Sequence, residues 1–293
     1  MNYLIYLNGK TVPENEACIS IRDRGFLYGD GLFETIRAYN GNAFRLDAHL
    51  DRLFTSAKEF KIHLNYTPIQ LRSAVQNLLT LNKLTDAYIR ITLSRGTPTN
   101  PKSQIPNPKK GFQPTLVIET KPLTPYPQEY YKHGISIIVS KTRISASWPL
   151  AAHKTLNFMN NILSREDANS KGAQEVLFLN TDGHVAECSV SNIFLVKNNE
   201  IITPSLTANI LPGITRKTVL EVCKQNGIVA REELFNLERL IAADEVFLTN
   251  SLMEVMPVAT IDKHSLSLPV PGRLTKRIME AYRKATLIPS EVI

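Results

Sequence analysis

Apolar residues follow two different periods along the first part of the chain. Residues 31–39 alternate between apolar and polar, as a strand with one buried face does, whereas apolar residues in 48–60 recur at helical spacing. Asp47 precedes that helix and is expected to cap its N-terminus. The same reasoning predicts a hairpin over 3–12, a returning strand over 43–46, a helix over 68–82, and strands over 87–93 and 115–120.

The second part of the chain contains the same kinds of element in a different order. Strands are predicted over 135–141, 175–179, 184–187, 193–196, 201–202, 245–249 and 255–261, and helices over 156–170, 213–225 and 236–242. The mixture of helices and strands in both halves predicts an α+β or α/β fold.

Two proline-rich segments interrupt these patterns. Residues 96–114 contain five prolines and are expected to form a long loop. Residues 122–127 (PLTPYP) are excluded from a helix or a central strand, because proline lacks the N–H group that both need. We therefore predict a small domain of residues 1–121, a linker of residues 122–133, and a larger domain of residues 134–293.

Composition and charge exclude several classes of protein. With 43% hydrophobic residues among 293, disorder is excluded as the main state, and no apolar run approaches the ~20 residues of a membrane span. The net charge of +7 is scattered, and no basic run is interleaved with aromatics, so neither nucleic acid nor a membrane is the expected partner. Positive charge suits small anionic ligands instead.

Cysteine usage and the N-terminus predict a cytoplasmic protein. The three cysteines, Cys18, Cys188 and Cys223, are far apart and form no CxxC motif, so neither a disulfide framework nor a cysteine zinc site is expected. The first residues also lack the features of a signal peptide.

Three short segments carry candidate chemistry, although each is weak by itself. Pro212-Gly213 at a helix start leaves N–H groups available for a phosphate. Glu187 ends a predicted strand, and Lys154 precedes a predicted helix; an isolated residue of either kind is usually a solvated surface group. Phosphate-loop, GxSxG and HExxH motifs are absent from the sequence, and no metal site is expected.

Together these segments resemble the class IV aminotransferases, which are the fold-type IV pyridoxal-phosphate enzymes. The resemblance rests on E-C-S-V-S-N-I-F from Glu187 and L-P-G-I-T-R from Leu211, and on segments 23–37, 49–53, 87–90, 243–247 and 256–258. It implies a two-domain fold like that of D-amino acid aminotransferase, with the active site between the domains and the lysine and phosphate site in the larger domain. It also implies a homodimer. Residues 96–114, which are too polar to pack alone, are a candidate for a loop that reaches the site of the partner subunit, and the sequence leaves this question open.

The resemblance assigns a task to each candidate residue. Lys154 is similar to the lysine that holds the cofactor aldehyde and moves the substrate proton, and Glu187 to the carboxylate that pairs with the pyridine nitrogen. The phosphate would be held by the side chains of Arg52 and Ser251 and by the backbone N–H groups of Ile214 and Thr215.

Two further residues receive no direct role in the reaction. His49 lies one helical turn from Arg52, and we interpret it as part of an exposed helix face. Asn192 is expected to position the Glu187 loop rather than to touch the substrate.

Within this family, three activities share the same first step. They are transamination of branched-chain amino acids, transamination of D-amino acids, and the lyase reaction that releases 4-aminobenzoate and pyruvate from aminodeoxychorismate. The expected substrate-binding residues are Tyr28, Phe33, Arg37, Tyr88 and Arg90.

The sequence favours an aminotransferase that acts on a small amino acid, of the branched-chain kind, and a 2-oxo acid. Segments 33–39, 87–90, 211–216 and 275–278 resemble branched-chain aminotransferases. However, Thr35 and Phe158 depart from their pattern, and segments 153–157 and 249–257 are more similar to the lyase, which therefore stays the alternative. The Arg-x-His pair of some D-amino acid aminotransferases is missing at residues 88–90.

Overall fold

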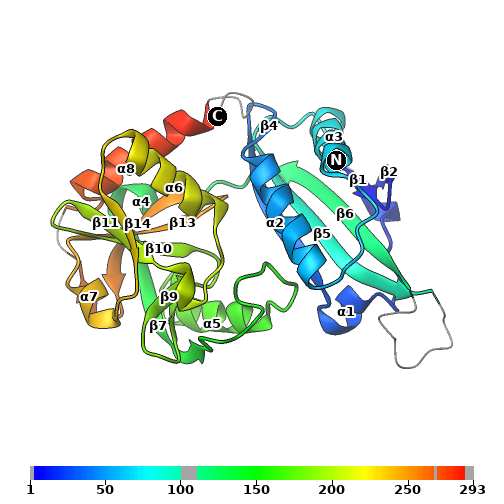
Figure 1. Cartoon of the computed structure of the whole chain (residues 1–293). Helices are drawn as coiled ribbons and strands as arrows, with labels where there is room; N and C mark the ends of the chain where they lie inside the picture. The colour runs from blue at the N-terminus through cyan, green and yellow to red at the C-terminus, as the bar shows by residue number, and fades with distance from the viewer. Residues whose placement is uncertain (1–2, 100–110, 267–268, 288–293) are drawn as a thin grey trace. The chain divides into compact units, whose positions relative to one another are not determined.

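A computed structural model of the chain describes residues 3–99, 111–266 and 269–287, which divide into two compact units (Figure 1). The N-terminal unit holds the chain up to Thr124 together with Lys154–Phe158. The C-terminal unit holds Pro125–His153 and the chain from Met159 onward. None of the helices in the described ranges is both long enough and apolar enough to span a bilayer.

An antiparallel sheet forms the centre of the N-terminal unit. In the described residues it has six strands in the order β2-β1-β6-β5-β3-β4. Their bounds are Leu4–Leu7 (β1), Lys10–Pro13 (β2), Gly31–Tyr39 (β3), Asn42–Ala43 (β4), Ala87–Pro98 (β5) and Phe112–Pro122 (β6). The helices are α1 (Arg24–Tyr28), α2 (Leu46–Glu59) and α3 (Pro68–Leu81), with a 3-10 turn at Glu14–Glu16.

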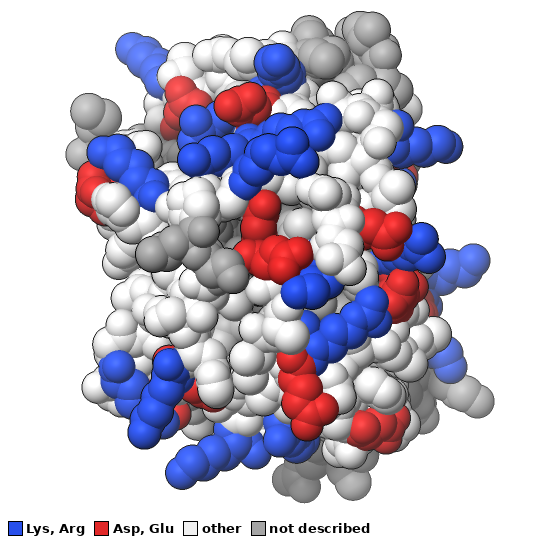
Figure 2. Space-filling model, turned by 90° about the vertical axis from the view of Figure 1, so that its left-hand side faces the viewer, with Lys and Arg blue, Asp and Glu red and all other residues white. Residues whose placement is uncertain are grey.

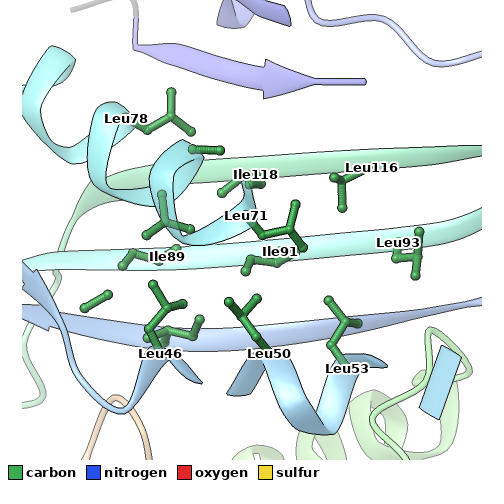
Figure 3. Close-up of a cluster of buried hydrophobic side chains, with 14 of the residues drawn as sticks. Leu46, Leu50, Leu53, Leu71, Leu78, Ile89, Ile91, Leu93, Leu116 and Ile118 are labelled. Atoms are coloured by element: carbon green, nitrogen blue, oxygen red, sulfur yellow. The ribbon is translucent and has the colours of Figure 1, made fainter. Parts of the chain in front are cut away.

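Helices α2 and α3 cover one face of this sheet with apolar side chains (Figure 3). Leu32 and Ile36 of β3 point to the same side as Ile89 and Ile91 of β5, because side chains alternate along a strand. Leu50 and its neighbours in α2 fill the space above them. The alternate residues, Phe33, Thr35 and Arg37 of β3 and Tyr88 and Arg90 of β5, therefore face the other side of the sheet.

The start of α2 differs from the prediction. Arg45, in a left-handed conformation with φ of 53°, is the residue that precedes the helix, so Asp47 is not its cap. Asp47 lies in the first turn and pairs with Arg72 on the surface. The turn at Arg45 leads the chain directly from β4 into α2, which leaves only two residues for the strand predicted over 43–46.

The long loop predicted over residues 96–114 is shorter at both ends. Strands β5 and β6 continue across these residues, with Thr97 opposite Gln113 and Pro98 opposite Phe112. A bulge between Ser94 and Thr97 shifts the register and lets the pairing continue. The bulge requires a glycine at position 96, because a side chain there would meet the Gln113 carbonyl oxygen at 1.7 Å. Residues 100–110 of the predicted loop lie outside the described residues.

The C-terminal unit is built on a mixed sheet. In the described residues it has nine strands, eight of them in the order β12-β11-β10-β13-β14-β7-β8-β9, and β15 pairs with β14. The strands are Ile135–Ile144 (β7), Glu175–Asn180 (β8), Val185–Cys188 (β9), Asn192–Lys197 (β10), Glu200–Pro204 (β11), Ala230–Glu233 (β12), Glu245–Asn250 (β13), Glu254–Ile261 (β14) and His264–Ser265 (β15). The helices are α4 (Gln128–His133), α5 (Met159–Ser170), α6 (Ile214–Gln225), α7 (Leu237–Ile241) and α8 (Arg273–Thr286), with a 3-10 turn at Leu206–Ala208.

Strand β8 shows how this sheet is packed. Val176 and Phe178 face a cluster that includes Ala168 of α5, whereas Leu177 and Leu179 face the main core on the other side. All of β8 is therefore buried, as its continuous apolar run requires.

Helix α4 occupies half of the segment that the sequence analysis predicted as a linker, and the sequence analysis did not predict helix α8.

The segment that contains Lys154 groups with the N-terminal unit, not with the C-terminal domain to which the sequence assigned it. Thr155 forms an antiparallel bridge with Leu32 at the start of β3. Pairing with β3 keeps residues 154–158 extended, so α5 begins at Met159 rather than at residue 156.

Charged side chains on the surface are mixed in sign. On the face drawn in Figure 2, Lys and Arg side chains lie among Asp and Glu side chains instead of forming one continuous basic surface. This arrangement agrees with the scattered basic residues of the sequence.

Candidate active site

Backbone pairing with β3 holds Lys154 in the N-terminal unit. Phe33 donates its backbone N–H to the Lys154 carbonyl at 2.9 Å, and Leu156 donates to Gly31 at 2.9 Å. These bonds direct the Lys154 side chain along β3, where Nζ lies 4.5 Å from the centre of the Phe33 ring. The amine is thus held by a rigid strand rather than by a free loop.

The buried Phe33 ring is the centre of a group of side chains from three segments. The Arg90 guanidinium of β5 lies 4.0 Å from the ring centre, and Phe158 contacts the ring edge-on at 5.6 Å. Lys154 and Arg90 therefore contact the same ring, which attracts cations through its face. Each of these positive groups lies within 4.5 Å of the ring centre, and a guanidinium is well suited to bind a carboxylate.

The predicted substrate-binding residues of β3 and β5 share one face of the sheet. Arg37 pairs in register with Tyr88, and Thr35 pairs with Arg90. Because alternate residues of a strand face the same side, Phe33, Arg37, Tyr88 and Arg90 lie together on the face opposite to α2. Tyr28 is separate from them in sequence and lies in α1, where it is 62% exposed.

Arg52 lies on the helix-covered face and directs two N–H groups at Glu34. Its Nε and Nη2 atoms are 2.8 and 2.6 Å from the Glu34 carboxylate, which also accepts a bond from His49 Nδ1 at 2.7 Å. His49 is 2% exposed, so its assignment to an exposed helix face was wrong. The sequence analysis missed Glu34, although the alternation in 31–39 puts its carboxylate on the apolar side of the strand.

Burial and pairing shift the pKa values of this cluster. Burial raises the pKa of Glu34, but the Arg52 charge and the hydrogen bonds from Arg52 and His49 outweigh it and lower the pKa to about 2. Burial lowers the pKa of His49 against the opposing effect of Glu34. An ionised Glu34 therefore accepts a bond from a neutral His49 and fixes the direction of the Arg52 guanidinium.

In the C-terminal unit, Glu187 is held at the end of β9 by two donors. The Leu211 backbone N–H lies 3.2 Å from both carboxylate oxygens, and Asn192 Nδ2 lies 3.0 Å from Oε2. Asn192 also donates to the Leu211 carbonyl at 3.0 Å. Asn192 thus positions Glu187, as the sequence predicted, and links it to the segment before α6.

Helix α6 begins directly beside this link. A side chain at Gly213, the residue before the helix, would meet Asn192 Oδ1 at 2.0 Å. No side chain caps the helix, so its first N–H groups, at Ile214 and Thr215, stay suited to an anion. The 12-residue helix adds its dipole to this effect.

Ser251 follows β13, whose last residues lie next to the start of β10. Thr249 pairs in register with Asn192, and the Thr249 hydroxyl is buried without a hydrogen-bond partner in the part of the chain that the structure describes. Asn250 accepts bonds from the N–H groups of Leu252 and Met253 at 2.9 and 2.8 Å, which shapes the turn around Ser251. These groups, together with the start of α6, fit a phosphate.

The described residues contain no comparable set for a metal. In residues 3–99, 111–266 and 269–287, no three His, Cys, Asp or Glu side chains are grouped as ligands.

Comparison with known proteins places this combination of fold and residues in a family. A family model described as "Amino-transferase class IV" matches residues 31–261. The chain belongs to this family of enzymes, whose members use pyridoxal phosphate. The resemblance seen in the sequence is thereby confirmed, together with the mixed α and β fold.

The relatives of the chain differ in their activities. It is 38% identical to a putative branched-chain-amino-acid aminotransferase of Methanocaldococcus jannaschii, with 95% of each chain covered. It is 34% identical to a D-alanine aminotransferase of Bacillus licheniformis, with 97% of each covered, and 31% identical to an aminodeoxychorismate lyase of Bacillus subtilis, with 96% and 94% covered. Its fold is similar to that of the Escherichia coli branched-chain amino acid aminotransferase, with a TM-score of 0.91, 30% identity, and 97% and 94% covered.

Glu34 is expected to make the stability of the protein depend on pH in acid. Its folded pKa of about 2 lies below the ordinary 4.5, so its ionised form stabilises the fold above pH 4.5, and this contribution disappears as the pH falls toward 2. In Glu34→Gln, the free energy of unfolding should depend less on pH in this range. One titrating group changes the slope by at most about 1.4 kcal/mol per pH unit. Urea unfolding between pH 7 and pH 3 measures it.

Asp47→Asn provides the control for this experiment. Asp47 and Arg72 also form an ion pair, but their side chains are 57% and 52% exposed. A pair of this kind contributes little, so the pH dependence should stay that of the wild type. An unchanged acid slope in Glu34→Gln would contradict the lowered pKa of Glu34.

Proposed function

We propose that the protein is a pyridoxal-phosphate-dependent aminotransferase that transfers an amino group between a small branched-chain amino acid and a 2-oxo acid. One observation carries this proposal: the Arg90 guanidinium and the Lys154 amine contact the same Phe33 ring, at 4.0 and 4.5 Å. A substrate whose carboxylate pairs with Arg90 would have its amino carbon near Lys154. The branched-chain relatives support the choice of substrate.

Each candidate residue has a task in this reaction. Pyridoxal phosphate supplies an aldehyde for the amino group and a ring that accepts electrons from the substrate α-carbon. Lys154 would hold and move a proton at its Nζ atom. Glu187, whose carboxylate accepts bonds from Leu211 and Asn192, would pair with the ring nitrogen of the cofactor.

The phosphate is assigned to the backbone and side-chain groups that the family resemblance names. Ile214 and Thr215 would donate backbone N–H groups, and Ser251 would donate its hydroxyl. Arg52 would add a positive charge, and Glu34 would hold the direction of its guanidinium. Lys154 and Glu187 are both assigned to the cofactor because the family resemblance gives a role to each of them.

The substrate is assigned to the outer face of β3 and β5. Arg37 and Arg90 provide charges for carboxylates, and Tyr88 provides a hydroxyl. Phe33 and Phe158 present aromatic surface to an apolar side chain. Tyr28 would join this set from α1.

The lyase reaction is the second candidate. Phe158 packs against Phe33 but carries no hydroxyl to bond the cofactor ring oxygen, a bond expected in branched-chain aminotransferases. Asn250 shapes the turn at Ser251, and this segment is similar to the lyase in sequence. The Bacillus subtilis relative supports this alternative, and the D-alanine aminotransferases support a third, transfer from D-amino acids.

We also propose that the protein is a homodimer. A run of apolar side chains near α1 is exposed in the single chain: Ile19 (49%), Ile21 (78%), Phe26 (67%), Leu27 (50%) and Tyr28 (62%). Helix α5 exposes Met159 (65%), Ile162 (45%) and Leu163 (57%). Apolar groups that are clustered in this way usually mark an interface with another protein.

Lys154 is expected to carry the cofactor. The protein mixed with pyridoxal phosphate should show an absorbance band that borohydride removes, and peptide mapping should find the reduced adduct on Lys154. Lys154→Arg keeps the charge but not the nucleophilic amine, so amino transfer should fall by at least about a thousandfold. Lys121→Arg, with a 49% exposed side chain in the same unit, should behave as the wild type. An adduct on another lysine would refute the assignment.

The proposed substrates can be tested with a panel of donors and acceptors. We expect leucine, isoleucine or valine to transfer their amino group to 2-oxoglutarate in a ping-pong pattern. Arg90→Gln should raise the KM for 2-oxoglutarate about tenfold, because a hydrogen bond between charged groups is lost. Initial rates with each donor, including glutamate and D-alanine, measure both effects.

Two results would replace this function with one of the alternatives. Release of 4-aminobenzoate from aminodeoxychorismate without a 2-oxo acid, together with negligible transfer from all amino acids, would establish the lyase. A kcat/KM for D-alanine well above that for leucine would establish the D-specific enzyme.

The homodimer predicts twice the chain mass of 32.9 kDa in light scattering. Phe26→Asp puts a charge into the exposed apolar run and should shift the protein toward the monomer. Leu81→Asp changes a 53% exposed leucine at the end of α3 and serves as the control. A wild-type protein that is monomeric and fully active would contradict the proposal.

A further inference from the structure

The buried carboxylate of Glu175 lies outside the site described so far. Glu175 is the first residue of β8 and is 2% exposed. Its oxygens accept bonds from the Ser189 hydroxyl, from the Ser191 hydroxyl at 3.4 Å, and from the Val176 N–H at 2.9 Å. No Lys, Arg or His in the described ranges forms an ion pair with it. A buried carboxyl group destabilises a fold unless it is hydrogen-bonded, and the bonds of Glu175 connect the start of β8 to the segment of Ser189 and Ser191.

The two serines belong to one turn, residues 188–191, which joins β9 to β10. The turn is closed by a bond from the Cys188 N–H to the Ser191 carbonyl at 2.8 Å, and the Ser189 N–H bonds to Val176 of β8 at 3.1 Å. Glu175 thus fastens the turn to β8 by both serine hydroxyls. Glu187 precedes the turn directly and Asn192 follows it directly.

Two amide side chains hold the turn from other directions. Asn161 Nδ2 donates to the Ser189 carbonyl at 2.7 Å, and Asn250 Nδ2 donates to the Val190 carbonyl at 3.2 Å. Glu175 is the charged member of this set, and it holds two turn residues at once.

The pKa of Cys188 shows that Glu175 and Glu187 both lie near the end of β9. Burial raises the pKa of its thiol well above the ordinary value, and the charges of Glu175 and Glu187 add to the effect. Glu175 therefore lies close to the residue that follows Glu187. A carboxylate in this place affects both the geometry and the electric field at the end of β9.

We propose that Glu175 is a positioning residue that fixes the 188–191 turn and, through it, holds Glu187 against Leu211 and Asn192. This inference rests on the proposed function, since it gives Glu187 its task at the ring nitrogen of the cofactor. Glu175 itself touches neither cofactor nor substrate. Its carboxylate offers one acceptor oxygen to each serine, whereas a glutamine would replace one of these oxygens with an NH2 group, which only donates.

The test compares four proteins: the wild type, Glu175→Gln, Glu187→Gln and the double variant. Glu175→Gln should bind pyridoxal phosphate within about threefold of the wild type, because the phosphate contacts remain. The rate of substrate proton removal should fall about tenfold or more, and the pH midpoint of the bound-cofactor absorbance should shift as in Glu187→Gln. The double variant should be no slower than Glu187→Gln, because Glu175 acts through Glu187.

Glu245→Gln is the matched control. Glu245 is also a carboxylate of the C-terminal unit that accepts two bonds, from the N–H groups of Leu274 and Thr275 at the start of α8. Its replacement should lower the melting temperature without changing the absorbance or the rate. Ser191→Ala removes one contact of Glu175 and should give a smaller change of the same kind, which keeps the test available if Glu175→Gln folds poorly.

Amide hydrogen exchange of the protein without cofactor separates this inference from the proposed function. In Glu175→Gln the N–H groups of Cys188 and Leu211 should exchange about tenfold faster than in the wild type. If the wild type binds no pyridoxal phosphate, the proposed function fails, and the exchange rates still decide whether Glu175 fixes the turn. Unchanged exchange, losses that add in the double variant, or a lower melting temperature with an unchanged spectrum would overturn the inference.

Discussion

The pleat of β3 is the constraint on which the arrangement of the N-terminal unit depends. Successive residues of a strand face opposite sides, so the side chains of Phe33 and Glu34 leave β3 on opposite faces, although the Lys154 amine lies close enough to His49 for its charge to lower the pKa of that imidazole. Glu34 meets His49 and Arg52 under α2, and Phe33 meets Arg90 and Lys154 on the other face. A shift of one residue in the register of β3 would exchange these two environments and would bury Arg37 in the apolar core.

In the C-terminal unit, one amide side chain connects elements that are distant in sequence. Asn192 bonds both to Glu187 and to the carbonyl of Leu211, and it fills the space beside Gly213. The end of β9, the start of β10 and the start of α6 therefore keep a fixed geometry. Under the proposed function, the carboxylate and the backbone N–H groups act on opposite ends of one cofactor, and such a task would need this rigid connection.

Local patterns predicted the elements but not their long-range contacts. The bounds of β3 were predicted to the residue because its alternation is regular, and the start of α6 within one residue because Pro212-Gly213 marks it. The sequence analysis assigned residues 154–158 to the C-terminal domain. This assignment failed because their pairing with β3 joins segments more than a hundred residues apart, and such a pairing leaves no local pattern in the sequence. Asp47 had the right chemistry for a cap, but the left-handed turn at Arg45 started the helix earlier.

The candidate site was predictable to the extent that it repeats a family sequence, which gave Lys154, Glu187 and the segment from Leu211. The residues that orient these groups were harder to predict from the sequence. The carboxylate of Glu34 was visible as a charged group on an apolar strand face, but its partners depend on how α2 lies over that strand. No sequence pattern indicated a role for Glu175, because its hydrogen-bond donors are two serines in the turn between β9 and β10.

Gly213 has a consequence for how activities diverge on this scaffold. Since Asn192 Oδ1 occupies the volume that a Cβ atom at Gly213 would need, a side chain at this position would displace Asn192 and with it the bond to Glu187. Thr35 and Arg37 on β3 and Tyr88 and Arg90 on β5 are only partly buried and already carry side chains. Under the proposed function, substrate preference would therefore change more readily on this sheet face than at Gly213, where any side chain disturbs the carboxylate of Glu187.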